Sequence, residues 1–315
     1  MFAIGMDIGG TNTVFGIVDK AGKVLAEDSV KTRDFPVLDD YIQAVSVRIK
    51  QLCEKQGIKM SDIAGLGIGA PNANYYKGTI EFAPNLPWKD AVIPLADLFS
   101  AALGGMKVKA TNDANAAALG EKTYGVAKDF DNFIMITLGT GVGSGIVVNG
   151  ELVYGHDGFA GELGHVIVKP NGRLCGCGRK GCLETYCSAT GIVRTAKEFL
   201  QTSDEPSLLR SIPLDGITSK DIYDAAVKGD AMAVQIFKET GTILGQAFAN
   251  FVAFSSPEAI ILFGGLAKAG DFIRKYAYEA MEANLLNIYK GKTRLLVSSI
   301  KDSDAAVLGA SAIAW

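Results

Sequence analysis

The stretch FAIGMDIGGTNTVFGIVD, residues 2–19, decides how the chain folds. Its first apolar run ends in the turn Gly9-Gly10-Thr11, and its second ends at Asp19, where Asp-Lys-Ala-Gly carries the residues of a hairpin turn. A third run, KVLAED, follows at residues 23–28. The pattern predicts three consecutive strands, with a glycine-rich turn after the first and a hairpin turn after the second.

The same outline returns further along the chain. The segment NFIMITLGTG begins at Asn132 and ends a predicted strand in a glycine-rich turn, GSGIVV follows as a strand, and Asn149-Gly150 is a two-residue hairpin signal. The tripeptide Gly16-Ile17-Val18 matches Gly145-Ile146-Val147 in register. We interpret this as a duplicated unit, with one copy at the start of each of two domains.

The segments between and after the two copies alternate between strand and helix patterns. Residues 40–56 repeat apolar side chains at helical spacing, which predicts an amphipathic helix. Further strands are expected in residues 63–71, 107–111 and 258–263, and further helices after Asn112 or Asp113, over residues 231–257 and up to residue 281. Strands that alternate with helices in this way predict an α/β fold.

The composition limits the classes of protein to which the chain can belong. A length of 315 residues fits two domains, and 48% apolar residues indicate a folded core. No apolar run reaches the ~18 residues of a membrane span, and Asp7 near the start argues against a signal peptide. The 31 Lys and Arg against 34 Asp and Glu favour neither nucleic acid nor a membrane surface as partner. An odd number of cysteines, five, favours reduced thiols or metal ligands, and hence a cytoplasmic protein.

Three glycine-rich turns are candidates for phosphate binding: Gly9-Gly10-Thr11, Gly139-Thr140-Gly141 and Gly264-Gly265. Open α/β sheets bind ligands at such turns, because backbone N–H groups there can point at an anion. The P-loop pattern GxxxxGK[ST] is absent. Each turn taken alone could simply connect two strands. A nucleoside triphosphate bound by two lobes would account for all three turns.

Five motifs together identify a family. DIGGTNTVFG from Asp7, NDAN from Asn112, LGTGVGSG from Leu138, GELGH from Gly161 and CGCGRKGCLE from Cys175 occur in one chain. Their order and spacing resemble those of the ROK family of sugar kinases and repressors over essentially the whole sequence. The resemblance implies a two-domain, actin-like (ribonuclease H-like) ATPase fold with a sugar-binding cleft between the domains.

The resemblance also implies a division of the chain. The small domain would contain residues 1–118 and a C-terminal helix at about 303–315 that returns to it. The large domain would contain residues 119–302, including a zinc loop and a dimerisation surface. The family suggests a homodimer or a dimer of dimers.

Asp113 is the candidate catalytic base. It lies between a predicted strand and a predicted helix, where a structural N-cap is the alternative. A carboxylate at the end of a strand can accept the proton of a sugar hydroxyl as that hydroxyl attacks the γ-phosphate. In the family the aspartate of this motif is that base, and Asn112 beside it would hold a neighbouring hydroxyl.

Asp7 could cap its turn, yet a carboxylate beside a phosphate-binding hairpin requires a cation, so Mg²⁺ is expected with the ATP. The resemblance places Asp7 near the metal and the phosphate. The complete set of expected nucleotide contacts is Asp7, Gly9, Gly10, Thr11, Asn12, Gly139, Thr140, Gly141, Gly264 and Gly265.

The expected sugar contacts are acidic or polar. Glu162 and His165 lie three residues apart, so a helical turn would put them on one face. The resemblance implies that Glu162, His165 and Glu184 bind the sugar hydroxyls, together with Asn112, Asp113 and Asn85. Asn85 lies in PNLPW, which plain turn chemistry could also explain.

The stretch GHVIVKPNGRLCGCGRKGCLE, residues 164–184, contains one of the two histidines and three of the five cysteines. His165, Cys175, Cys177 and Cys182 suit a tetrahedral structural zinc with no open position. Such a zinc would fold the loop so that His165 and Glu184 face the sugar. The alternative is a redox-active or idle thiol cluster. Cys53 and Cys187 are expected to be packing residues.

The sequence therefore predicts an ATP-dependent sugar kinase that phosphorylates the 6-hydroxyl of a hexose, with glucose as the expected substrate. N-acetylglucosamine, mannose and fructose are the alternative substrates. A ROK-type sugar-responsive repressor carries an N-terminal helix-turn-helix, for which no room is expected ahead of Asp7. An actin-like structural ATPase would not explain the zinc loop.

Overall fold

The computed structural model describes residues 1–315, apart from the side chain of Asp302. The chain divides into two compact units. Unit 1 consists of Met1–Asp131, Gly145–Gly161 and Ser298–Trp315, and unit 2 consists of Asn132–Ser144 and Glu162–Val297. The expected domain boundary at residue 118 stays a prediction.

The sheet of unit 1 has the strand order β3-β2-β1-β4-β8. β1, β2 and β3 are antiparallel neighbours, and β4 and β8 continue the sheet in parallel from β1. Asp19 stabilises the predicted hairpin, because its carboxylate accepts the N–H groups of Ala21 and Lys23 at 2.9 Å. The strands are Phe2–Ile8 (β1), Thr13–Asp19 (β2), Val24–Val30 (β3), Ile63–Gly69 (β4) and Val108–Thr111 (β8).

Four helices and a small sheet complete unit 1. The first helix buries Ile42, Val45 and Ile49, as their spacing predicts, while Leu52 is only partly buried. The small sheet has the order β5-β6-β7. The bounds are Leu38–Lys55 (α1), Leu95–Ala102 (α2), Asp113–Tyr124 (α3), Asp302–Ala312 (α9), Ala73–Asn74 (β5), Thr79–Glu81 (β6) and Val92–Ile93 (β7), with 3-10 turns at Thr32–Asp34 (η1) and Met60–Asp62 (η2).

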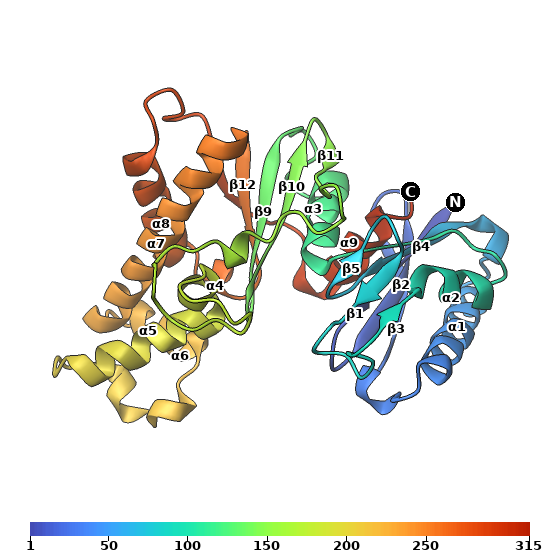
Figure 1. Ribbon diagram of the computed structural model, residues 1–315, viewed down its shortest axis with the longest axis horizontal. Coiled ribbons are helices and arrows are strands. Elements are labelled where there is room, and N and C mark those ends of the chain that lie inside the picture. The colour runs from blue at the N-terminus through green and yellow to red at the C-terminus, as the bar shows by residue number, and fades with distance from the viewer. The chain divides into compact units, whose positions relative to one another are not determined.

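Helix α9 packs directly on the strands at the start of the chain, as Figure 1 shows for the red helix beside the blue strands. Gly5 on β1 and Gly67 on β4 are paired neighbours in the sheet. A Cβ at Gly5 would lie 1.9 Å from the carbonyl oxygen of Val307, and a Cβ at Gly67 would lie 1.9 Å from that of Ala310. Only glycine permits this approach of backbone to backbone. The C-terminal helix therefore packs against the strands that begin the chain.

The second sheet has the order β11-β10-β9-β12-β13, which repeats the order of the first sheet position by position. The predicted duplication is therefore confirmed. Asn149 and Gly150 have φ angles of 52° and 80°, as a two-residue hairpin requires. The strands are Phe133–Leu138 (β9), Val142–Val148 (β10), Glu151–Leu152 (β11), Ala259–Phe263 (β12) and Arg294–Val297 (β13).

The in-register match of Gly16 with Gly145 has a packing reason. A Cβ at Gly16 would lie 3.0 Å from Val307 Cγ1 of α9, and a Cβ at Gly145 would lie 2.6 Å from the Cβ of Ala118 on α3. Gly16 lies on β2, between β3 and β1, and Gly145 lies on β10, between β11 and β9. Each glycine makes space for a helix to pack against the central one of these three strands.

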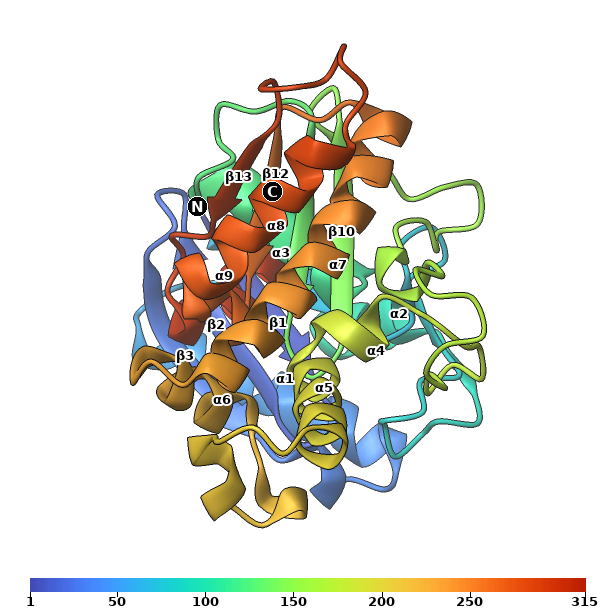
Figure 2. The same ribbon diagram turned by 90° about the vertical axis from the view of Figure 1, so that its left-hand side faces the viewer.

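Five helices belong to unit 2, and Figure 2 shows the two long ones, α7 and α8, side by side. They are Glu184–Cys187 (α4), Ala189–Thr202 (α5), Ser219–Val227 (α6), Ala231–Ser255 (α7) and Asp271–Asn284 (α8). The 3-10 turns are Leu163–His165 (η3), Leu208–Ser211 (η4), Leu214–Gly216 (η5) and Leu266–Ala269 (η6). None of the helices described for the chain combines the length and the apolarity that a membrane crossing needs.

Candidate active site and metal centre

Asp113 begins α3 immediately after the parallel strand β8. The N-cap of this helix is Asn112, whose side chain accepts the Ala114 N–H at 2.9 Å. Asp113 Oδ1 accepts the same N–H at 2.8 Å. Because Asn112 supplies the cap, the helix does not depend on the Asp113 carboxylate for its first turn. The Asn112 oxygen is occupied there, so its amide N–H groups are the part that can reach a ligand.

Asp113 is exposed as a residue, while protein lies close around its carboxyl group. Desolvation by that protein raises the pKa of Asp113 above its ordinary value, although the N–H groups of Ala114 and of Asp113 itself oppose the rise. A base with a raised pKa holds a proton more readily at neutral pH. A raised pKa is one property that a general base requires.

Asp7 lies on β1, on the other side of Gly69 from Asp113. A Cβ at Gly69 would lie 3.5 Å from Asp7 Oδ1 and 3.7 Å from the Cα of Asp113. Burial, followed by the negative charge of Asp113, raises the pKa of Asp7 to about 7. Two carboxylates that disfavour each other's charge are suited to share a proton or a cation.

The first glycine-rich turn forms a closed hairpin at residues 9–12. The Gly9 N–H donates to the Asn12 carbonyl at 2.9 Å, and the Thr32 N–H donates to the Thr11 carbonyl at 3.0 Å. A Cβ at Gly10 would lie 2.4 Å from the carbonyl oxygen of Asn85. The loop that contains the expected sugar residue Asn85 therefore packs on the expected phosphate hairpin.

Hydrogen bonds between buried hydroxyl groups stabilise the segment next to this hairpin. Thr13 Oγ1 contacts the Tyr41 hydroxyl at 2.8 Å and Thr32 Oγ1 at 3.0 Å. The Tyr41 ring lies 4.6 Å from that of Trp88, the last residue of PNLPW, and Trp88 Nε1 donates to the Phe35 carbonyl at 3.1 Å. Burial raises the pKa of Tyr41, so its hydroxyl stays neutral and can donate. The loop of Asn85 and the hairpin are thus connected through the same buried contacts around Tyr41.

The second glycine-rich turn, in unit 2, packs against the start of α5. The Ala189 N–H donates to the Gly139 carbonyl, and the Thr190 hydroxyl donates to the Thr140 carbonyl, both at 2.8 Å. Glu184 Oε2 accepts the Val142 N–H at 3.1 Å, and a Cβ at Gly141 would lie 2.2 Å from this oxygen. Gly141 is therefore required for the approach of Glu184 to the turn.

Glu162 and His165 lie in a single 3-10 turn, as their spacing predicts. The His165 N–H donates to the Glu162 carbonyl at 3.1 Å. The turn is seated on β10, because a Cβ at Gly164 would lie 1.9 Å from the Val142 carbonyl oxygen. The Leu163 N–H also donates to Ser144 Oγ at 3.1 Å. The structure thus places Glu162, His165 and Glu184 around the beginning of one strand.

His165, Cys175, Cys177 and Cys182 form a compact group of four metal-type ligands. Their ligand atoms all lie within 4.8 Å of one another. Cys175 Sγ lies 3.7 Å from His165 Nδ1, and Cys177 Sγ lies 3.7 Å from Cys182 Sγ. Two sulfurs that are each ~2.3 Å from a tetrahedral zinc lie ~3.8 Å apart. The donor set and its spacing therefore fit zinc.

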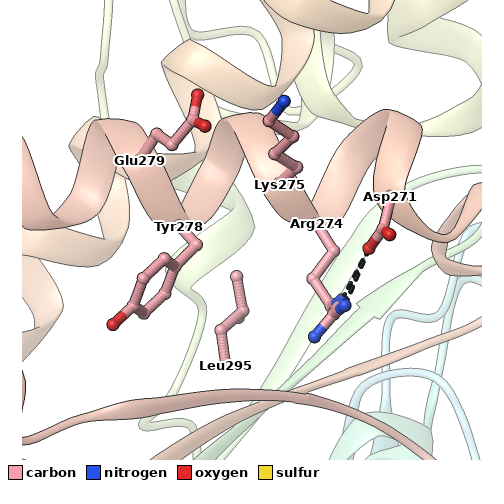
Figure 3. A pocket seen from close by; sticks show the side chains of 6 residues that line it. All are labelled: Asp271, Arg274, Lys275, Tyr278, Glu279 and Leu295. Atoms are coloured by element: carbon pink, nitrogen blue, oxygen red, sulfur yellow. Dashed lines mark hydrogen bonds and ion pairs between the residues drawn. The ribbon is translucent and has the colours of Figure 1, made fainter.

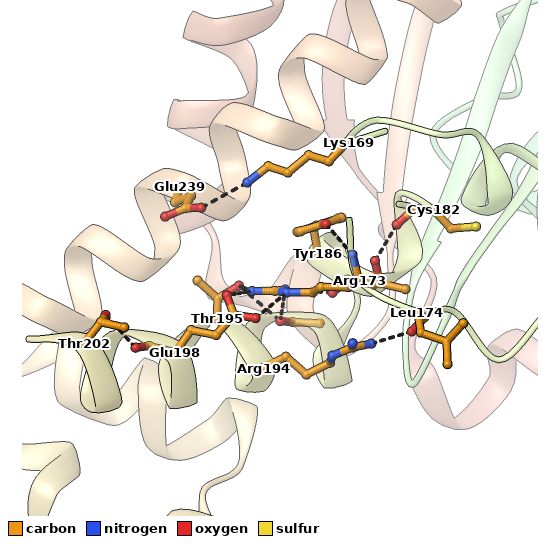
Figure 4. Close-up of polar contacts among 12 residues, drawn as sticks. Lys169, Arg173, Leu174, Cys182, Tyr186, Arg194, Thr195, Glu198, Thr202 and Glu239 are labelled. Atoms are coloured by element: carbon orange, nitrogen blue, oxygen red, sulfur yellow. Dashed lines mark hydrogen bonds and ion pairs between the residues drawn. The ribbon is translucent and has the colours of Figure 1, made fainter. Parts of the chain in front are cut away.

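Arg173 holds the loop of this centre on the helices behind it (Figure 4). Its Nε and Nη2 donate to the two carboxylate oxygens of Glu198 at 2.8 and 2.6 Å, and its Nη1 donates to the Thr185 carbonyl at 2.8 Å. The guanidinium lies 4.5 Å from the centre of the Tyr186 ring. The Arg173 side chain is 9% exposed, whereas the Glu198 side chain is 56% exposed. The metal loop is thus fixed at Arg173, two residues before the first cysteine.

Comparison with known proteins identifies the family. A model of the ROK family matches residues 3–315. The chain belongs to the ROK family. It is 34% identical to the glucokinase of Thermotoga maritima over 314 residues, which cover 98% of this chain and 96% of the relative. It is 36% identical to the glucokinase of Halalkalibacterium halodurans over 313 residues, with 97% and 92% covered.

The fold of this ROK chain is similar to a solved structure with ligands. The crystal structure of a ROK family glucokinase from Streptomyces griseus in complex with glucose and AMPPNP matches with a TM-score of 0.80, at 34% identity and 99% coverage of both chains. The expected α/β, two-domain, actin-like fold is thereby confirmed.

The third glycine-rich turn of the ROK chain borders a hollow of about 290 Å³ in unit 2. Gly264 has a φ of 96°, and a Cβ there would lie 2.8 Å from the Leu138 carbonyl oxygen. Tyr223 and Phe237 supply aromatic surface, and Lys220 and Lys268 supply charge. A larger hollow of about 350 Å³ lies along α8 and is lined by residues outside the expected site (Figure 3): Asp271, Arg274, Lys275, Tyr278, Glu279 and Leu295.

Three sets of contacts around the candidate site are not evident from the motifs. Tyr41 lies in a segment whose apolar spacing predicts a helix, so the sequence suggests a core residue and not a hydrogen-bonding hydroxyl group. Arg33 donates to Thr11 Oγ1 at 2.8 Å from a segment between two predicted elements. Arg173 lies in a run of charged and glycine residues that resembles a solvated loop. Each of these side chains contacts residues that are distant in the sequence, and the local spacing of residues does not predict such contacts.

Proposed function

We propose that the protein transfers the γ-phosphate of ATP to the 6-hydroxyl of glucose. The observation within this chain that carries the proposal is the pair of Asp113 and Asp7, two carboxylates with raised pKa values on either side of Gly69. A base and a cation-binding carboxylate in such proximity suit phosphoryl transfer, in which charge neutralisation supplies most of the catalysis. The likeness to two glucokinases over nearly the whole chain supports glucose as the hexose.

The roles follow from the chemistry of each group. The 6-hydroxyl gives its proton to Asp113, its oxygen forms the new bond to the γ-phosphorus, and the bond to the β-phosphate oxygen breaks to release ADP. Mg²⁺, when bound, neutralises charge on the β- and γ-phosphate oxygens. Asp7 is the residue that would hold the ion, directly or through water.

The proposed sugar contacts are amide, imidazole and carboxylate side chains. Asn112 offers amide N–H groups, since its oxygen caps α3. Asn85 belongs to the loop fixed on Gly10. Glu162, His165 and Glu184 belong to the turn and helix beside the four-ligand centre. Carboxylates that accept two hydroxyl groups and amides that donate to them suit the vicinal hydroxyls of a pyranose.

The proposed nucleotide contacts are the backbone groups of the three glycine-rich turns. Gly9, Gly10, Thr11 and Asn12 are proposed for the terminal phosphates, together with Gly139, Thr140 and Gly141. Gly264 and Gly265 are proposed to lie near the adenine base, because Gly265 borders the hollow that Tyr223 and Phe237 line, and the size and character of this hollow suit adenine.

Zinc is the proposed metal of His165, Cys175, Cys177 and Cys182. Zinc supplies a fixed tetrahedral framework when all four positions are filled by protein. His165 would bind it through Nδ1, which faces Cys175, and keep Nε2 for the sugar. The role of the centre is therefore to orient His165 and Glu184.

The compartment and the assembly are further proposals. The structure joins none of the five cysteines in a disulfide, which suits the reducing cytoplasm in which ATP and free sugar are present. A homodimer or a dimer of dimers is proposed on family grounds. Light scattering of the purified protein at several concentrations measures its mass directly.

A coupled assay of ADP release across a panel of hexoses and hexosamines tests the function. Glucose should give the highest kcat/KM. If N-acetylglucosamine, mannose or fructose exceeds glucose tenfold, the substrate is wrong while the enzyme class stands. If no sugar stimulates ADP release, the kinase function itself is wrong, and sugar-dependent binding to DNA becomes the next assay.

A further inference from the structure

Arg33 is a cation fastened to the first glycine-rich hairpin by its neighbour in the chain. Thr32 is fully buried, its N–H donates to the Thr11 carbonyl at 3.0 Å, and its hydroxyl contacts Thr13 Oγ1 at 3.0 Å. Arg33 follows in the same 3-10 turn, η1. Its backbone position is therefore set by the hairpin itself.

The guanidinium of Arg33 is oriented but not neutralised. Its Nη2 donates to Thr11 Oγ1 at 2.8 Å, and the residue is exposed. Among the side chains that the structure describes, no carboxylate forms an ion pair with Arg33. A guanidinium has five N–H donors, so this one bond to a hydroxyl leaves most of its capacity for another acceptor.

Arg48, in the same unit, differs from Arg33 because it forms an ion pair with a carboxylate. Its Nη1 donates to both carboxylate oxygens of Asp28 and to the Ser29 carbonyl, each at 3.2 Å. Its charge is paired within the protein, and its side chain is 47% exposed. Arg48 is therefore an exposed arginine with a structural use, and it provides a matched control.

The hairpin needs positive charge if it binds a phosphate. Asp7 precedes the hairpin on β1, and Asp113 is close enough for its charge to raise the pKa of Asp7. A terminal phosphate would add further negative charge to this pair. A guanidinium matches the geometry of phosphate oxygens and binds them through two parallel N–H groups.

We infer that Arg33 binds a terminal phosphate group of the nucleotide, with Thr11 holding its guanidinium in place. This inference rests on the proposed kinase function, because it assigns the phosphate of that reaction to the first hairpin. It adds a side chain to a site for which the motifs indicate backbone N–H groups and Mg²⁺.

The test compares the binding of AMPPNP and of adenosine to wild type, Arg33→Ala and Arg48→Ala by titration calorimetry in the presence of Mg²⁺. Arg33→Ala should weaken AMPPNP binding by roughly 10- to 100-fold, because a charge-assisted contact is lost, and should leave adenosine binding unchanged. Arg48→Ala should bind both ligands like wild type. Arg33→Lys should recover part of the AMPPNP affinity, since it keeps the charge without the fork.

Two results would overturn the inference: AMPPNP affinity of Arg33→Ala within twofold of wild type, or an equal loss for AMPPNP and adenosine. Thermal melts of the same samples show whether each variant is folded. A wild-type protein that binds AMPPNP but phosphorylates no sugar would contradict the proposed function instead. The two failures are therefore distinguishable.

Discussion

Burial and the negative charge of Asp113 raise the pKa of Asp7 to about 7. The two carboxylates come from β1 and from the first residue of α3, on either side of Gly69. This pairing costs stability in the absence of a cation, because each charge disfavours the other. Such a loss of stability is expected of a site that binds a cation. It can be measured as the pH dependence of the free energy of unfolding.

Asp7→Asn should change how stability depends on pH. The native pKa of Asp7 is raised from 3.8 to about 7, so between these values the native state binds more protons than the unfolded state. Stability of the wild type should fall as pH rises through this window, and the slope should flatten in Asp7→Asn. Near pH 7 the variant should be more stable by roughly 1–4 kcal/mol. Urea titrations from pH 4 to pH 8 without Mg²⁺ measure this, and identical slopes for both proteins would contradict it.

Asp113→Asn should abolish most of the turnover and leave the fold intact. Removing a general base typically lowers the rate by ~10²–10⁴. Asn112 supplies the cap of α3, so the melting temperature and the metal content should stay near those of wild type. The measurement is kcat at saturating glucose and ATP.

Asp271→Asn is the matched control for Asp113→Asn, since Asp271 is also the first residue of a helix and lies outside the proposed site. Its kcat should equal that of wild type. A folded Asp113→Asn protein with a kcat within about threefold of wild type would remove Asp113 from the mechanism, because a base contributes far more.

Cys177→Ser should lose the metal and with it the affinity for glucose. The four ligands close the coordination sphere, so loss of one sulfur weakens the whole centre. Purified wild type should contain about one zinc per chain. Metal analysis and glucose titration of the variant are compared with those of Cys53→Ala, whose buried thiol lies outside the centre and should keep both. A fully active wild type without zinc would refute the assignment.

Arg173→Lys should destabilise the protein although it keeps the charge. Lysine cannot reproduce the bidentate contact with Glu198 together with the bond to the Thr185 carbonyl, so the part-buried carbonyl of Thr185 loses its donor. We expect a loss of roughly 1–3 kcal/mol in the free energy of unfolding. Arg48→Lys, at an exposed ion pair, should cost less than ~1 kcal/mol. Equal losses for the two variants would show that Arg173 is not a special anchor.

The sequence predicted those features that depend on local pattern. The glycine-rich turns and the alternating strands indicated both sheets, because their signals occupy a few consecutive residues. The spacing of His165, Cys175, Cys177 and Cys182 predicted the four-ligand centre for the same reason. The family resemblance supplied the return of α9.

The remainder depends on contacts between distant segments. Asp7 and Asp113 acquire raised pKa values only when β1 and α3 meet beside Gly69. The sequence left open whether Asn112 or Asp113 is the N-cap of α3, since both residue types cap helices. The N-cap in the structure is Asn112. The anchors Arg33 and Arg173 have no motif, because a guanidinium can reach its acceptors from almost any loop.

The packing of α9 on Gly5 and Gly67 also bears on how the protein is made. Residues 302–312 are translated long after β1 and β4, and until they leave the ribosome one face of those strands has no partner. Unit 1 therefore starts first on the ribosome and is completed after unit 2 has emerged. The apolar face of β1 and β4 that α9 covers therefore stays without this helix during most of synthesis, and a premature stop near residue 300 would remove the helix altogether.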